Sequence, residues 1–338
     1  MQSPDSLISV LRYMRSAAVR AMRGRELLGR EIPADAASGR NAPCWVHEAP
    51  GGGERPVVFE MHGGGFALGD ARKEDALRAW VSRCFDVHVV GVEYRLAPEH
   101  PAPAALEDAL ATISFVASGA AGIAVRPDGL YALGYSAGAN LALACAFAMQ
   151  KRDDIAFAGL ALHYPFLDAA TPPVAAEARD IDLPFELMNA FNVWYVGKGD
   201  ARDPLISPLF ATDAQLVALP PVAMRPVVGD ELFVQADALR ARLEGVGAKP
   251  MWHPVEGMYH GYIEDAADVE SYEAATMPET IAARPAGYVD AAGEQLRGSL
   301  EDLLGPAPRP EPFPGSTAAA RDASRAAGKG PEGKDASR

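Results

Sequence analysis

The sequence predicts an α/β fold in which a mostly parallel β-sheet carries helices on both faces. Short apolar stretches alternate with longer stretches of helical periodicity, a pattern typical of parallel strands joined by crossover helices. The chain has 338 residues, 49% hydrophobic and 22% charged, which is enough to bury a large core. We therefore expect one main α/β domain over residues 41–304.

The elements of this fold can be taken in order. Strands are expected at PVVFEMH (56–62), VHVVGVEY (87–94), GLYALGYS (129–136), FAGLALHYP (157–165), VAMRPVVG (222–229) and KPMWHPV (249–255). Helices are expected at 72–85, 103–117, 137–150 and 232–245. Ligands of such folds bind beyond the carboxyl ends of the strands, so functional residues are expected in the loops that follow them.

Three segments depart from the alternation. Residues 1–40 begin with a basic amphipathic helix, which is interpreted as a lid or surface helix, with a transit peptide or membrane-surface helix as alternatives. Residues 171–216 form an insertion that is interpreted as a lid. Residues 305–338 are rich in Pro, Gly, Ala and Ser, which predicts a disordered tail. The insertion contains an apolar cluster of Phe185, Leu187, Met188, Phe191, Trp194 and Tyr195.

Composition excludes several classes of function. The formal net charge of −14 would repel nucleic acid and anionic lipid, which favours a small, largely neutral ligand. No apolar run approaches the roughly 20 residues that span a bilayer, and the first residues lack a secretory signal, so a cytoplasmic location is expected. The three cysteines, Cys44, Cys84 and Cys145, are unpatterned, so we expect neither disulfides nor a metal site.

One motif suggests a nucleophile. Gly134-Tyr135-Ser136-Ala137-Gly138 is G-x-S-x-G where a predicted strand meets a predicted helix. At such a junction a sharp turn exposes the serine hydroxyl, and the flanking glycines avoid collisions of Cβ atoms. The five-residue pattern alone is weak evidence, because it occurs by chance in roughly one chain of this length in ten. A phosphate-binding loop is the competing interpretation, but no G-x-G-x-x-G or G-K-[ST] is present here.

A second motif supports this interpretation. The sequence His62-Gly63-Gly64-Gly65 follows the predicted strand 56–62. Its backbone N–H groups can point to one place and, with the N–H of Ala137, stabilise the oxyanion of a tetrahedral intermediate. The alternative is a flexible glycine turn.

A serine nucleophile needs a histidine base and an acid, which in this arrangement follow the serine in the order acid, then histidine. His163 precedes any plausible acid and His253 lies in an apolar run, so His260 is the expected base. Asp230 is the expected acid and Glu231 the reserve. Asp230 could instead be only a helix cap.

The ordered blocks HGGGFALGD, YRLAPEHPAPAALEDA, GYSAGANLA, DPLISPL, GDELFVQADALRARLEGVG and GMYHGY resemble those of the bacterial hormone-sensitive-lipase-like esterases, which have the α/β-hydrolase fold. The resemblance covers roughly residues 40–265. It implies cofactor-free hydrolysis of short-chain carboxylic esters by a triad of Ser136, Asp230 and His260. It also implies oxyanion N–H groups from Gly64, Gly65 and Ala137, and a helical cap from residues 1–40 and 171–216.

Other functions remain open. An arylformamidase or other amidase, or a natural-product deacetylase or acyltransferase, would use the same residues, whereas a non-catalytic small-molecule receptor would not need His260. Tyr135, Phe191 and Trp194 are candidates for the substrate pocket, with core packing as the alternative for the last two. The expected partner is a small-molecule ester, and a homodimer is possible.

Overall fold

The structure is a computed structural model, and it describes residues 7–172, 185–268, 284–285 and 287–316. The described chain forms one eight-stranded sheet with the order β1-β2-β4-β3-β5-β6-β7-β8. Six strands are parallel and correspond to the six expected from sequence: β3 (Arg55–Met61), β4 (His88–Val92), β5 (Val125–Tyr135), β6 (Gly159–His163), β7 (Val222–Arg225) and β8 (Met251–Trp252). The predicted fold class is therefore confirmed.

Two further strands were not predicted. The strands β1 (Arg30–Ile32) and β2 (Cys44–His47) form an antiparallel edge, with β2 paired to β4. They are short, and all four residues of β2 are buried, so neither strand shows the alternation that marks a half-exposed strand. Because β1 lies inside segment 1–40, part of that segment belongs to the sheet.

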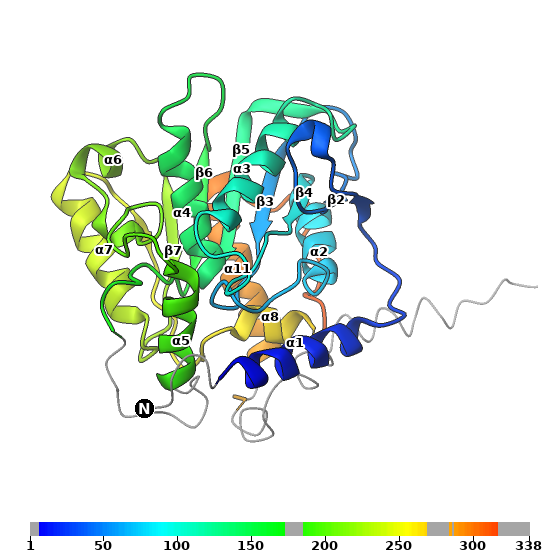
Figure 1. The fold of residues 1–338 in the computed structure, drawn as a ribbon. Helices are drawn as coiled ribbons and strands as arrows, with labels where there is room; N and C mark the ends of the chain where they lie inside the picture. The colour runs from blue at the N-terminus through cyan, green and yellow to red at the C-terminus, as the bar shows by residue number, and fades with distance from the viewer. Residues whose placement is uncertain (1–6, 173–184, 269–283, 286, 317–338) are drawn as a thin grey trace, which may run out of the picture.

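Helices cover both faces of the sheet (Figure 1). One face buries apolar residues of α3 (Ala104–Ala117), α4 (Ala137–Met149) and α7 (Phe233–Gly245). The other face buries those of α2 (Asp75–Phe85), α8 (Tyr262–Ala267) and α11 (Tyr288–Leu304). The described residues also contain three short elements: η2 (Ala36–Ser38), η3 (Pro208–Phe210) and α6 (Asp213–Val217).

Two helices lie apart from these layers. In Figure 1, α1 (Ile8–Met22) and α5 (Phe185–Val196) lie at the same end of the molecule as α8. They share a small apolar cluster with the loop that follows β3, made of Leu7, Leu11, Ala67, Ala97, Leu187, Ala190, Phe191 and Trp194. Residues 173–184 of the predicted insertion lie outside the described residues.

The start of the predicted tail is packed, which corrects the expectation of disorder from residue 305. Phe313 is 4% exposed and meets Trp80 edge to face, with ring centroids 5.1 Å apart. The Trp80 indole N–H donates a hydrogen bond of 3.1 Å to the carbonyl oxygen of Glu311. The single aromatic side chain of the tail thus anchors residues 305–316. Residues 317–338 lie outside the described part.

Candidate active site

Ser136 lies in a tight turn between β5, which ends at Tyr135, and α4, which begins at Ala137. Its backbone φ of 51° lies in a region that residues other than glycine rarely adopt. A Cβ atom at Gly138 would lie 2.0 Å from the carbonyl oxygen of Met61, and one at Gly134 would lie 2.4 Å from that of Gly138. Both glycines are therefore needed for the turn to pass this close to the neighbouring backbone.

His260 and Asp230 lie next to this serine. The Nε2 atom of His260 is 2.9 Å from the Oγ of Ser136, and its Nδ1 is 2.7 Å from the Oδ2 of Asp230. The other carboxylate oxygen of Asp230 accepts a 3.1 Å hydrogen bond from the N–H of Leu232, just before α7. The sequence left helix capping open as an alternative for Asp230, but the N-cap residue of α7 is Leu232, and no side chain caps the helix there.

The other histidines after the serine lie elsewhere. The Nε2 of His163 is 2.9 Å from the Oγ of Ser299, and both residues are fully buried. Burial, assisted by the charge of Arg225, lowers the pKa of His163 well below its usual value. The Nε2 of His253 is 3.6 Å from Asp302, on a side chain that is 54% exposed.

The glycine loop after β3, residues 62–70, is called the oxyanion loop below, after the role that the sequence resemblance implies for it. Gly64 and Gly65 have φ values of 117° and 60°. A Cβ atom at Gly64 would lie 2.4 Å from the carbonyl oxygen of Leu68. Among the backbone hydrogen bonds of the described residues, none is donated by the N–H of Gly64, Gly65 or Ala137. Ala137 is the first residue of α4, where N–H groups have no partner inside the helix.

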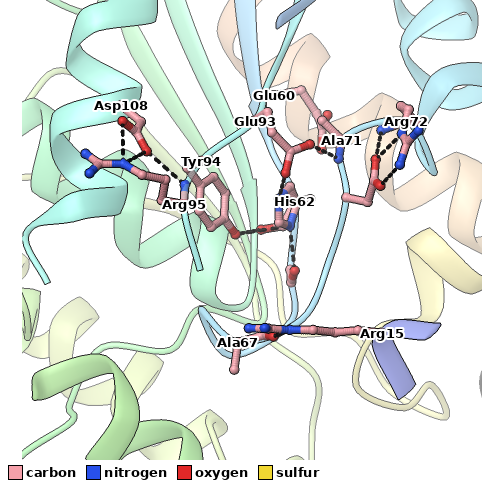
Figure 2. A network of polar contacts seen from close by, with 12 residues as sticks. Arg15, Glu60, His62, Ala67, Ala71, Arg72, Glu93, Tyr94, Arg95 and Asp108 are labelled. Atoms are coloured by element: carbon pink, nitrogen blue, oxygen red, sulfur yellow. Dashed lines mark hydrogen bonds and ion pairs between the residues drawn. The ribbon is translucent and has the colours of Figure 1, made fainter. Parts of the chain in front are cut away.

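Residues after β4 hold the first residue of the loop. The His62 ring stacks on Tyr94 with centroids 4.2 Å apart, and the Tyr94 hydroxyl donates a 2.8 Å hydrogen bond to the carbonyl oxygen of His62. Glu93 accepts a 2.8 Å hydrogen bond from the N–H of Ala71 and lies 4.0 Å from the Nε2 of His62. Figure 2 shows these groups together.

Burial favours the neutral forms of His62 and Glu93. It lowers the pKa of His62 to about 4 and raises the pKa of Glu93 to about 8. The charges of Asp70 and Arg78 act on both groups. Sequence reasoning assigned no role to Glu93 or Tyr94, although both lie at or beside the block YRLAPE.

Tyr164 and Glu264 form a second pair of residues near His260. Tyr164 meets the His260 ring edge to face at 5.0 Å, and its hydroxyl donates a hydrogen bond to Glu264. Glu264 lies directly behind the loop, since a Cβ atom at Gly63 would be 2.8 Å from its Oε1. Burial raises the pKa of Glu264. Neither residue was predicted, although Tyr164 is the next-to-last residue of the predicted strand 157–165.

The three candidate pocket residues are placed differently. The Tyr135 ring has no exposed surface and lies between His163 and Tyr164, so it is part of the core and does not line an accessible pocket. Tyr135 packs in the apolar cluster on the face of the sheet that α2, α8 and α11 cover. Phe191 and Trp194 are 5% and 6% exposed, and a Cβ atom at Gly65 would lie 2.3 Å from the Phe191 ring.

The described residues lack a metal-binding cluster and a membrane-spanning helix. They contain no group of three or more His, Cys, Asp or Glu side chains that could hold a metal ion. In the same residues, no helix has both the length and the apolar character needed to cross a membrane.

Comparison with known proteins shows which fold family and which enzymes this chain resembles. A family model for the alpha/beta hydrolase fold matches residues 58–264. Esterase LipI of Mycobacterium tuberculosis is 31% identical over 242 residues, which cover 71% of this chain and 76% of that protein. Carboxylesterase NlhH of the same species is 31% identical over 228 residues, covering 65% and 70%. A hyperthermophilic esterase from Pyrobaculum calidifontis superposes with a TM-score of 0.67 at 26% identity, covering 87% of this chain and 92% of that one.

Fold and relatives together define the protein as an α/β hydrolase. Within that class the chain belongs to the hormone-sensitive-lipase-like family of serine esterases and is a carboxylic ester hydrolase. The resemblance stated from the sequence blocks is thereby confirmed.

Proposed function

We propose that this carboxylesterase hydrolyses short- to medium-chain esters of small molecules through an acyl-enzyme on Ser136. The observation that carries the proposal is the chain of contacts from Ser136 Oγ through His260 to Asp230, at 2.9 and 2.7 Å. Both distances are those of hydrogen bonds, the arrangement expected of a nucleophile, its base and the group that orients the base.

The proposed steps follow from these contacts. Asp230 accepts a hydrogen bond from the Nδ1–H of His260, which leaves Nε2 free to take the proton of Ser136 as its oxygen attacks the ester carbonyl. His260 then gives this proton to the leaving alcohol, and an acyl-serine remains. Water, activated by the same histidine, attacks the acyl-serine and releases the carboxylic acid.

The oxyanion formed in each attack would be stabilised by the N–H groups of Gly64, Gly65 and Ala137. Their N–H groups donate to no backbone acceptor in the described part of the chain, so they are available to a substrate oxygen. Fixed donors of this kind stabilise a developing charge without reorganisation, and losing one costs about 10²- to 10³-fold in kcat.

The preference for shorter acyl chains rests on α5. Phe191 contacts the oxyanion loop at Gly65, so the aromatic face of this helix lies next to the proposed reaction centre. We propose that α1 and α5 act as a cap and that Phe191 and Trp194 limit the depth of the acyl pocket. A pocket of fixed depth gains from each methylene only until it is full.

A panel of p-nitrophenyl esters from acetate to palmitate tests the proposal. We expect kcat/KM to be highest for short or medium acyl chains and to fall for long ones. Adding an aryl acetamide and an acceptor alcohol to the panel separates hydrolysis of esters from amidase and acyltransferase activity. A preference for the amide, or transfer that outpaces hydrolysis, would contradict the proposal.

A further inference from the structure

We propose that Arg15 of the N-terminal helix α1 is a positioning residue that holds the oxyanion loop in its active shape. This inference rests on the proposed function, because it assigns Arg15 an effect on the N–H groups that would bind the oxyanion. It makes α1 part of the machinery of the site as well as a cover over it.

One guanidinium group makes all the relevant contacts. Its Nε donates a 2.9 Å hydrogen bond to the carbonyl oxygen of Ala67, in the oxyanion loop, and one terminal nitrogen donates a 2.6 Å bond to that of Ala97. The other terminal nitrogen lies 2.9 and 3.0 Å from the two carboxylate oxygens of Glu99. Figure 2 shows the Arg15 side chain extending to Ala67. A planar fork of fixed donors suits these acceptors, whereas the single ammonium of lysine does not.

The loop that Arg15 grips has an unusual backbone. Gly64, Gly65 and Phe66 follow one another with φ values of 117°, 60° and 59°. Such a conformation is costly for the non-glycine residue Phe66, and it persists only where surrounding contacts hold it. The aromatic ring of Phe66 is held by stacking on Tyr195, with centroids 3.6 Å apart.

The backbone of the same stretch is joined to residues 94–99 by two adjacent links. The carbonyl oxygen of Phe66 accepts a 2.8 Å hydrogen bond from the N–H of Ala97. Arg15 bridges the next carbonyl, that of Ala67, to the carbonyl of Ala97. Without Arg15, the bond from Ala97 would be the only hydrogen bond among the described residues that joins Phe66 and Ala67 to residues 94–99, beside the ring contact of Phe66 with Tyr94 at 6.2 Å.

Apolar packing joins α1 to the loop on one side of Arg15. Leu7 and Leu11 share a cluster with Ala67 and Ala97, and Met14 and Leu68 pack against that cluster. On the other side, an open pocket of about 440 Å³ lies between α1 and the end of the loop, and Arg15 is among its lining residues. Arg15 therefore lies at the boundary between the packed and the open part of this interface.

The consequence for catalysis is geometric. Oxyanion donors act only when they already point to where the negative charge develops. Gly64 and Gly65 lie two or three residues from Ala67, so a loop released at Ala67 would let their N–H groups turn. Misplacement by about 1 Å can cost on the order of 100-fold in rate.

The test compares Arg15→Met and Arg15→Lys with Arg12→Met, which removes an exposed arginine from the same helix. With p-nitrophenyl butyrate, we expect Arg15→Met to lower kcat by about 10- to 100-fold while KM changes little. The Ki of a trifluoromethyl ketone, which forms an oxyanion on the serine, should rise by the same factor. Arg15→Lys should lose several-fold because it keeps the charge and loses the fork. Arg12→Met should match the wild type.

The outcomes separate this inference from the proposed function. If the wild type hydrolyses the ester, Ser136→Ala does not, and Arg15→Met matches the wild type in kcat and Ki, the positioning role is wrong and the proposed function stands. If the wild type is no faster than Ser136→Ala, the proposed function fails. Should Arg15→Met not fold, Arg15→Lys decides, because unchanged kcat and Ki in that variant would overturn the role.

Discussion

Two serine–histidine pairs in this molecule have the same distance and different surroundings. His260 Nε2 lies 2.9 Å from Ser136 Oγ, and His163 Nε2 lies 2.9 Å from Ser299 Oγ. The proton arrangement distinguishes them. Asp230 accepts a hydrogen bond from the Nδ1–H of His260, so His260 Nε2 is an acceptor toward Ser136. The Ser299 hydroxyl donates to the carbonyl oxygen of Leu296, so His163 Nε2 donates to Ser299.

A histidine that donates to a serine cannot be its base. His163 is also fully buried, and within the described part of the chain its Nδ1 meets no hydrogen-bond partner, whereas the His260 side chain is 24% exposed. Ser299 lies inside helix α11, whereas Ser136 lies in a turn and has a positive φ. The acid at Nδ1, access to substrate and the positive φ of the serine thus distinguish the two pairs, while the serine–histidine distance does not.

The largest expected effect separates the two serines. Ser136→Ala should lower kcat by about 10⁶-fold, the scale seen when a triad nucleophile is removed. Ser299→Ala should leave kcat unchanged and cost about 1–3 kcal/mol in the free energy of unfolding, because it removes two buried hydrogen bonds and leaves the Nε2–H of His163 without its acceptor. Ester hydrolysis by the two purified variants, with circular dichroism to confirm folding, tests this. Near wild-type turnover in folded Ser136→Ala would refute the assignment.

The acid is the next feature to break. Asp230→Asn should lower kcat by about 10⁴-fold, because an amide no longer fixes His260 in the tautomer that accepts from serine. It would make this pair resemble that of His163 and Ser299. Glu231→Gln, one residue along, is the matched control and should change kcat little. The opposite ranking of the two variants would move the acid to Glu231.

Much of this comparison is visible in the sequence. The order serine, acid, histidine excluded His163, and the glycines around Ser136 marked the turn. The sequence could not show that Tyr135 is buried behind the nucleophile, since that depends on which sheet face each side chain meets. Nor could it show the contacts of Arg15, whose partners at residues 67 and 97 are 52 and 82 positions away. Strands β1 and β2 were missed because short antiparallel edges lack a periodic signal.

A smaller effect concerns the cap. Trp194 is buried in the cluster shared by α1 and α5, with its ring 6.0 Å from that of Phe191. If it limits the acyl pocket, Trp194→Ala should shift the optimum of kcat/KM by a few carbons toward longer esters. Val193→Ala changes the neighbouring residue, which is 50% exposed, and should leave the profile unchanged. Loss of stability with an unchanged chain-length profile would assign Trp194 to core packing alone.

The last prediction concerns His163, which should affect the pH dependence of stability and leave activity unchanged. The pKa of His163 in the folded state is well below the unfolded value of about 6.5, so the folded state favours the neutral imidazole. Below about pH 6.5 the unfolded chain binds a proton here that the folded chain does not. The stability contributed by this site is therefore complete above pH 6.5 and is lost as pH falls toward the folded pKa, by about 1.4 kcal/mol per pH unit.

His163→Gln keeps a donor near the position of Nε2 and removes the titration. We expect an unchanged kcat at pH 7.5 and a free energy of unfolding that falls less steeply between pH 6.5 and 5, by about one proton's worth of slope. Some acid sensitivity should remain, because burial also lowers the pKa of His47, His62 and His88. Urea unfolding at several pH values measures the slope. A variant whose slope equals that of the wild type would show that His163 does take up a proton in the folded state, and the contrast between the two histidines would then rest on Asp230 and access to substrate alone.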